Sequence, residues 1–129
     1  MTTAKRIRLG IVFLCALFLA QMFVQMGLVK FETDGFWTAA FDRWGYPVWF
    51  RIAVGVVEVV GGVAILLPWV ASWGAAALTA VMAEAVVTRA FDGWWGDVAW
   101  NSLYIAVLIW IGTEWWRWRW HPARQLDRR

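Results

Sequence analysis

Hydrophobic residues in this chain gather into four long runs that are separated by polar segments. The runs cover about residues 7–29, 48–67, 70–88 and 98–116. Each is close to the roughly 20 apolar residues that an α-helix needs to cross the hydrocarbon core of a bilayer. The pattern therefore predicts an all-α chain, an integral membrane four-helix bundle in which successive helices run up, down, up and down.

The connections between the runs differ in length and character. Residues 30–46 mix acidic and aromatic side chains, which favours a position at the membrane interface with a short amphipathic helix around residues 35–41. The connection at Pro68 and Trp69 is very short, so the third helix is expected to pack antiparallel to the second. Residues 1–129 are predicted to form one transmembrane domain, with residues 117–129 as a polar tail.

Composition agrees with a membrane protein. The chain is 62% hydrophobic and 16% charged, whereas soluble domains are about 45–50% apolar and about 25% charged. The net charge of +3 comes from basic residues that border the apolar runs rather than cover a folded surface. This placement makes the lipid bilayer the expected partner and argues against nucleic acid.

Basic residues also predict the orientation in the membrane. The two terminal segments carry eight of the twelve Lys and Arg residues. Loops rich in Lys and Arg stay in the cytoplasm, so both termini are expected there and the longer loops outside. The chain is thus predicted to be a multi-pass protein of a plasma membrane.

The second run contains two charges that a lipid-facing helix would not tolerate. Arg51 and Glu58 lie seven residues apart, so two helical turns place them on one face. A charge near the bilayer centre costs about 2.5–3.5 kcal/mol on insertion scales, so both must face protein or water. Gly55, Gly61 and Gly62 give the same helix a strip of small residues for close packing.

With the predicted orientation, polar residues of all four helices fall in the outer half of the bundle. Glu58, Glu84 and Arg51 are the candidates for catalysis, because one carboxylate paired with Arg51 stays ionised while an unpaired one can carry a proton. The candidates for binding a substrate, such as a quinone, are two pairs of residues. They are Gln21 with Gln25 and Asn101 with Tyr104.

A purely structural interpretation stays open, in which the buried charges form an ion-pair network that fixes helix register and binds nothing. Metal chemistry is not expected, because the single Cys15 and the single His121 have no partners at metal-ligand spacing.

Several short motifs resemble a known family. They are Gly45-Tyr46-Pro47, the spacing Gly55-x-x-Glu58-x-x-Gly61-Gly62, Leu66-Leu67-Pro68 and Met82-x-x-Ala85. Together they look like the DoxX family of small four-helix bacterial membrane proteins, in particular its DoxX-like branch. The resemblance implies a four-helix bundle in the bacterial inner membrane. Glu84 and Arg89 depart from the pattern, where members often have glycine and histidine.

The resemblance also implies a function, because members include membrane components of quinone-reducing and oxidant-resistance systems. The leading expectation is therefore an oxidoreductase subunit that uses a quinone and works with a partner redox protein or as a homo-oligomer. One alternative is a non-catalytic scaffold or anchor for a partner enzyme. Another is a small proton-coupled transporter, which would need an inward opening that the apolar inner half does not offer.

Overall fold

Five α-helices make up the chain in the computed structural model, which describes residues 2–120. No β-strand occurs within these residues, so the all-α class is confirmed. The helices are α1 (Thr3–Val29), α2 (Phe36–Arg43), α3 (Val48–Ala64), α4 (Ala71–Phe91) and α5 (Trp95–Trp120).

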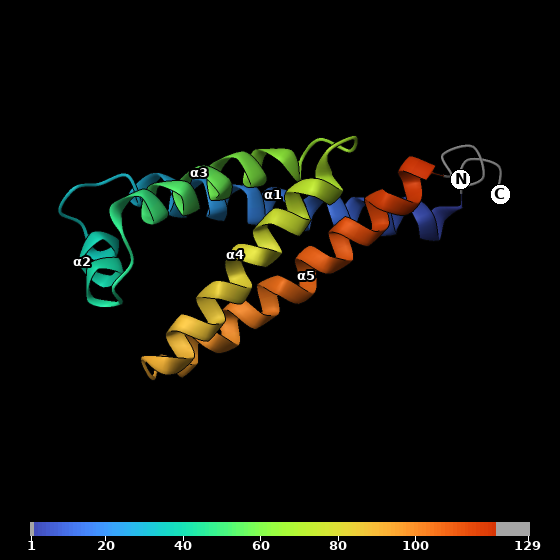
Figure 1. Cartoon of the computed structure of the whole chain (residues 1–129). Coiled ribbons are helices and arrows are strands. Elements are labelled where there is room, and N and C mark those ends of the chain that lie inside the picture. The colour runs from blue at the N-terminus through green and yellow to red at the C-terminus, as the bar shows by residue number, and fades with distance from the viewer. Residues whose placement is uncertain (1, 121–129) are drawn as a thin grey trace.

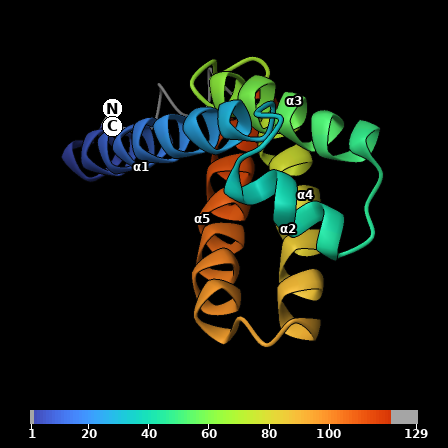
Figure 2. The ribbon, with the colours of Figure 1, turned by 90° about the vertical axis from the view of Figure 1, so that its left-hand side faces the viewer.

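The four long helices form two pairs, which converge at one end of the molecule and diverge at the other (Figure 1). α1 packs along α3, α4 packs along α5, and α3 also contacts α4. The short α2 lies across the divergent end (Figure 2). The start of α1 and the end of α5 lie near each other at the convergent end, where Arg8 and Glu114 form an ion pair.

Local chemistry explains where several helices begin and end. The Thr2 side chain accepts a hydrogen bond from the Lys5 backbone N–H at 3.2 Å and so caps the start of α1. Pro47 stands immediately before α3, where its missing N–H is not needed. Between α4 and α5, Gly93 has a φ of +78°, a conformation that favours glycine and permits the tight turn.

Some predicted boundaries were wrong. α4 continues to Phe91, so Arg89 belongs to the helix and not to a loop. α5 starts at Trp95 and continues to Trp120, because the sequence offers no helix breaker before Pro122. The first residues of the expected tail are therefore helical, and residues 121–129 lie outside the described part of the chain. The short helix predicted around residues 35–41 is present as α2.

Glycines bring the backbones of α1 and α3 into contact. A Cβ atom on Gly27 would lie 2.7 Å from the Gly55 carbonyl oxygen, and one on Gly55 would lie 2.9 Å from the Gly27 oxygen. Gly62 faces α1 as well, whereas Gly61 faces Leu78 of α4. The predicted strip of small residues on α3 is thus confirmed, and it serves both neighbouring helices.

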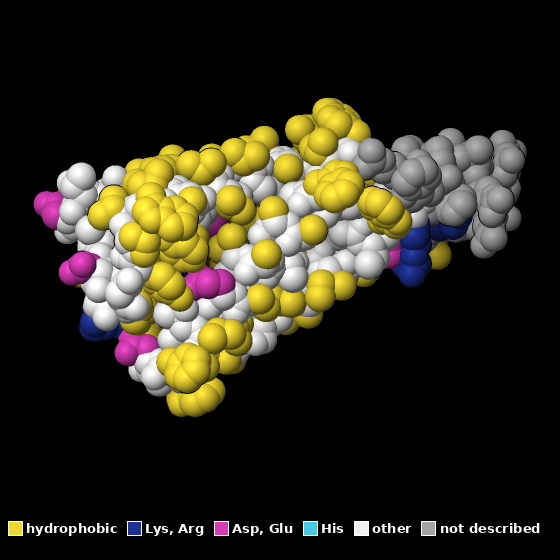
Figure 3. Space-filling model, in the orientation of Figure 1, with side chains coloured by type: hydrophobic (Ala, Val, Ile, Leu, Met, Phe, Trp, Pro, Cys, Tyr) yellow, Lys and Arg dark blue, Asp and Glu magenta, His cyan; other side chains and the backbone are white. Residues whose placement is uncertain are grey.

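Apolar side chains fill the space between the four long helices. The core consists of Val12, Ala16, Leu19, Ala20, Phe23, Ile65, Ala75, Leu78, Met82, Ala85, Leu108 and Ile111. Large apolar side chains also cover much of the outside of the molecule (Figure 3). On the face shown there, most charged side chains lie near the two ends.

Two helices, Thr3–Val29 and Ala71–Phe91, are long and apolar enough to cross a membrane. α3 is apolar too, but it contains 17 residues and ends at Ala64, before the turn around Pro68. The number of spans and the side on which the termini lie therefore stay predictions.

Candidate functional site

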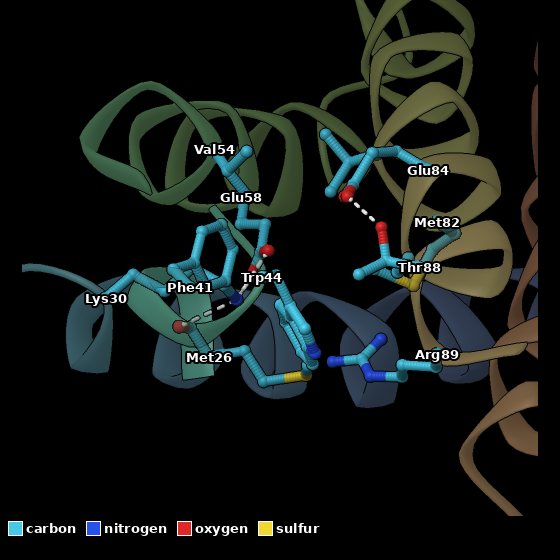
Figure 4. A pocket seen from close by; sticks show the side chains of 12 residues that line it. Met26, Lys30, Phe41, Trp44, Val54, Glu58, Met82, Glu84, Thr88 and Arg89 are labelled. Carbon is cyan, nitrogen blue, oxygen red and sulfur yellow. Dashed lines mark hydrogen bonds and ion pairs between the residues drawn. The ribbon is translucent and has the colours of Figure 1, made fainter. Parts of the chain in front are cut away.

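A small pocket lies where the two helix pairs diverge, beneath α2. The end of α1, Phe41 of α2 and the following Trp44, the middle of α3 and the second half of α4 contribute to it (Figure 4). The residues that line it are Met26, Lys30, Phe41, Trp44, Val54, Glu58, Val81, Met82, Glu84, Ala85, Thr88 and Arg89. Two of the predicted catalytic residues, Glu58 and Glu84, thus come together, on opposite walls of one pocket.

Glu58 is paired with a lysine. The Lys30 ammonium donates to both carboxylate oxygens of Glu58, at 2.7 and 2.9 Å. The two residues are 2% and 1% exposed. Lys30 also lies 5.1 Å from the centre of the Trp37 ring, where a cation is attracted by the aromatic face. Lys30 is therefore a buried ion-pair partner of Glu58 and not a solvent-exposed loop residue.

Arg51 holds the end of α1 instead of pairing with a carboxylate. It donates hydrogen bonds to the backbone carbonyl oxygens of Lys30 and Glu32, the latter at 2.6 Å. A cation is favourable there, because the last carbonyls of a helix have no partner within it and carry a partial negative charge. The network expected to join Arg51 to Glu58 and Glu84 is therefore replaced by contacts to the backbone. Arg51 lies beside a different surface pocket.

Glu84 is bonded to a hydroxyl group. Thr88 Oγ1 donates to Glu84 Oε1 at 2.7 Å, and the Tyr46 hydroxyl lies 2.6 Å from Thr88 Oγ1. Figure 4 shows Glu84 and Thr88 on the wall opposite Glu58. These contacts connect the pocket to the turn before α3.

Arg89 is the third buried cation, at 5% exposure. Its Nε atom lies 3.4 Å from Asp97 Oδ2, and its guanidinium carbon lies 4.9 Å from the centre of the Trp37 ring. Nη1 has no hydrogen-bond partner among the described residues, and Nε has only this ion-pair contact with Asp97. Buried polar groups normally find partners, so these donors point to a site where an acceptor can bind.

A groove between α1 and α5 lies on the other side of Arg89. It has a volume of about 350 Å³. Asn101, 4% exposed, contributes an Nδ2 atom that also has no hydrogen-bond partner within residues 2–120. Tyr104 stacks on Trp100, with 6.3 Å between ring centres. The groove is lined by Phe18, Met26, Trp37, Arg89, Asp97, Trp100, Asn101 and Tyr104.

The remaining sequence candidates lie apart from this groove. Gln21 and Gln25 share one face of α1, but that face is exposed and lines neither the pocket nor the groove. Among the described residues, no group of three or more His, Cys, Asp or Glu side chains is placed to hold a metal ion.

Sequence reasoning missed Lys30 and Arg89, although helical periodicity could have found both. Lys30 follows Phe23 and Gly27 at intervals of four and three residues, on the buried stripe of α1. Arg89 continues the stripe of Met82 and Ala85 on α4 at the same intervals. A basic residue that extends an apolar stripe is a candidate for burial.

Polar contacts connect the end of α2 to the α4–α5 turn. Asp92 Oδ2 accepts hydrogen bonds from Arg43 at 2.7 Å and from the Trp44 indole at 3.0 Å. The Trp44 hydrogen bond, followed by the contacts with Arg43, lowers the pKa of Asp92 below its ordinary value of 3.8. Arg43 also lies over the Trp94 ring. These contacts hold α2 across the mouth of the pocket.

Comparison with known proteins identifies the family. Residues 14–112 match the DoxX-like family, a stretch that contains the pocket, the groove and all of the core except Val12. No curated protein and no solved structure matches the chain significantly. The family match, together with the two apolar helices of membrane-spanning length, shows that this chain is a membrane protein of the DoxX-like family.

Proposed function

We propose that this protein is the membrane component of a quinone-linked redox or oxidant-resistance system and that the quinone binds in the groove between α1 and α5. The observation that carries the proposal is the set of buried donors there. Arg89 and Asn101 both offer N–H groups that have no hydrogen-bond partner among the described residues. A ligand that brings acceptors and no donors would satisfy them.

A quinone head group has this chemistry, because its two carbonyl oxygens only accept hydrogen bonds. The groove also has a volume within the usual range for small-molecule sites, about 300–1,000 Å³. Trp100 and Tyr104 offer ring faces for a flat head group, and the exposed Phe18 offers apolar surface for a hydrophobic tail. When bound, a quinone supplies the capacity to take up electrons and protons.

The candidate residues take separate roles in this proposal. Arg89, Asn101 and Tyr104 hold the head group, while Glu58 keeps Lys30 in place behind them. Arg51 fixes the end of α1, and Glu84 faces the pocket on the other side of Arg89. Electrons reach the quinone from a partner redox protein or a second copy of the chain.

The proposal includes four membrane spans, a bacterial inner membrane and cytoplasmic termini. The concentration of Lys and Arg in the terminal segments supports this orientation. The groove then lies in the outer half of the bilayer, where a quinone dissolved in lipid can enter from the side.

Quinone binding to the purified protein in lipid nanodiscs tests the proposal, with Asn101→Leu as the main variant. Removing an unsatisfied buried amide should leave the fold at least as stable, because no hydrogen bond is lost. Quinone affinity should nevertheless fall about tenfold, corresponding to roughly 1.4 kcal/mol.

The matched control is Gln25→Leu, which removes an amide on the exposed face of α1 and should leave affinity unchanged. If the folded wild-type protein binds no quinone, the proposal is wrong and the scaffold interpretation takes its place. Equal losses in both leucine variants would place the quinone elsewhere.

A further inference from the structure

Three side chains form a continuous hydrogen-bonded chain from the turn before α3 into the pocket. The Tyr46 hydroxyl lies 2.6 Å from Thr88 Oγ1, and Thr88 Oγ1 lies 2.7 Å from Glu84 Oε1. Tyr46 is half-buried and belongs to the segment between α2 and α3. Glu84 is half-buried on α4 and lines the pocket.

The donors in this chain are fixed by the chemistry of the hydroxyl group. Thr88 has one hydroxyl hydrogen, and it points to Glu84. In the contact with Tyr46, the threonine oxygen must therefore accept, and the phenol must donate. All hydrogens point inward, from Tyr46 through Thr88 to Glu84. Such an aligned chain polarises each of its members.

The pocket extends this chain towards the groove. The cavity within it has a volume of about 10 Å³, close to the size that accommodates one water molecule with several polar partners. Glu58, Lys30 and Arg89 supply such partners on the remaining walls. Met26 and Arg89 line both the pocket and the groove, so they form the wall between the two.

We propose that Tyr46, Thr88 and Glu84 form a proton relay between the aqueous side of the α2–α3 turn and this pocket. The Thr88 proton moves to the Glu84 carboxylate, the Tyr46 proton moves to the Thr88 oxygen, and water returns a proton to Tyr46. One proton enters and no electron moves. Glu84 then holds the proton on the wall of the pocket, beside the cavity. Its use in quinone chemistry rests on the proposed function, whereas the relay itself rests on the hydrogen-bonded chain.

The charged groups around Glu84 come from three helices. Lys30 at the end of α1, Glu58 of α3 and Arg89 of α4 all interact electrostatically with Glu84. Tyr46 approaches from the segment before α3. Two cations and one further carboxylate therefore act on Glu84, and none of these groups interrupts its contact with Thr88.

Infrared spectroscopy after a rapid drop in pH tests the relay in the purified, lipid-embedded protein. The carboxyl signal of Glu84 is assigned by its absence in Glu84→Gln. Thr88→Val keeps the shape of the side chain and removes the hydroxyl. It should slow protonation of Glu84 about tenfold or more, since a positioned proton donor contributes at least that much to transfer rates. Tyr46→Phe, which breaks the chain at its outer end, should slow it similarly.

The control is Thr79→Val on the same helix, because the Thr79 hydroxyl donates to the Ala75 carbonyl oxygen and is not part of the Tyr46–Thr88–Glu84 chain. In Thr79→Val, Glu84 should be protonated at the wild-type rate. Thr88→Ser restores a hydroxyl at position 88 and should recover the fast rate. If Glu84 is protonated as fast in Thr88→Val and Tyr46→Phe as in the wild type, the relay is wrong. Quinone affinity, measured separately, distinguishes this failure from a failure of the proposed function.

Discussion

The Lys30–Glu58 ion pair is buried in the protein, where either charge would be unfavourable without the other. Both side chains are nearly inaccessible to water, and the lysine reaches both carboxylate oxygens. Removing two charges from water is costly, and a buried pair recovers that cost only with good geometry and additional hydrogen bonds. The further contacts of Lys30 with the Met26 carbonyl and the Trp37 ring add to this recovery.

Removing one partner of this pair should destabilise the protein strongly. Lys30→Met leaves the Glu58 carboxylate buried without its cation, which typically costs about 3–5 kcal/mol. The double variant Lys30→Met/Glu58→Leu removes both charges and should recover most of that loss. Titration with sodium dodecyl sulfate in mixed micelles measures the free energy of unfolding of each variant.

The exposed Arg43–Asp92 pair provides the comparison. Both of its side chains are accessible to water, so Arg43→Met should cost less than about 1 kcal/mol. A double variant at positions 30 and 58 that is as unstable as Lys30→Met would contradict the assignment of the cost to an unpaired charge.

Single residues also show which features of the site could be predicted from the sequence. Glu58 could be found because a carboxylate in the middle of an apolar run demands a partner. The identity of that partner could not be predicted, because Lys30 meets Glu58 only where α1 and α3 approach closely in the folded chain. Gln21 and Gln25 were correctly placed on one face of α1, but periodicity alone does not tell which face meets a neighbouring helix.

At the scale of elements, the contact between α1 and α3 positions the pocket. The backbones touch at Gly27 and Gly55, and Lys30 lies less than one turn beyond Gly27. The helices themselves could be predicted from the apolar runs. Their ends could not be predicted in the same way. α4 continues through Arg89, which hydropathy alone assigns to a loop, and α5 continues through the tryptophan-rich segment, which hydropathy alone assigns to the tail.

Adding a methyl group at this crossing should separate the two helices. In Gly27→Ala the new Cβ meets backbone atoms of α3 that cannot move aside, and overpacking of this kind costs about 1–3 kcal/mol. Gly10→Ala is the matched control, because no atom lies within 4 Å of its added Cβ and alanine favours a helix.

The same detergent titration compares the two alanine variants. We expect Gly27→Ala to be less stable than the wild type and Gly10→Ala to be equally stable or more stable. Equal behaviour of both variants would show that the α1–α3 contact is not tight.

At the scale of the molecule, burial changes the count of charges that face water. Lys30, Arg51 and Arg89 are buried, so Arg43 is the only exposed Lys or Arg within residues 30–97. The exposed acidic residues of the same range are Glu32, Asp34, Asp42, Asp92 and Asp97. The divergent end therefore exposes fewer Lys and Arg side chains than the sequence count implied, which agrees with the expectation that it faces outward.

Cysteine labelling in intact cells tests this orientation. In a Cys15→Ala background, Asp42→Cys should react with a membrane-impermeant maleimide, because Asp42 is exposed at the divergent end. Thr3→Cys, at the opposite end, should react only after the cells are opened. The reverse pattern would place the pocket on the cytoplasmic side.

The buried cations affect how protons can move through the molecule. Among the described residues, the buried cations are Lys30, Arg51 and Arg89, whereas Glu58 is the one buried carboxylate, so the buried charges sum to a positive value. Positive charge along a passage repels hydronium and other small cations. Beyond it lies only the apolar core between the long helices. A proton that reaches Glu84 is therefore expected to stay at this end of the molecule rather than cross the apolar core.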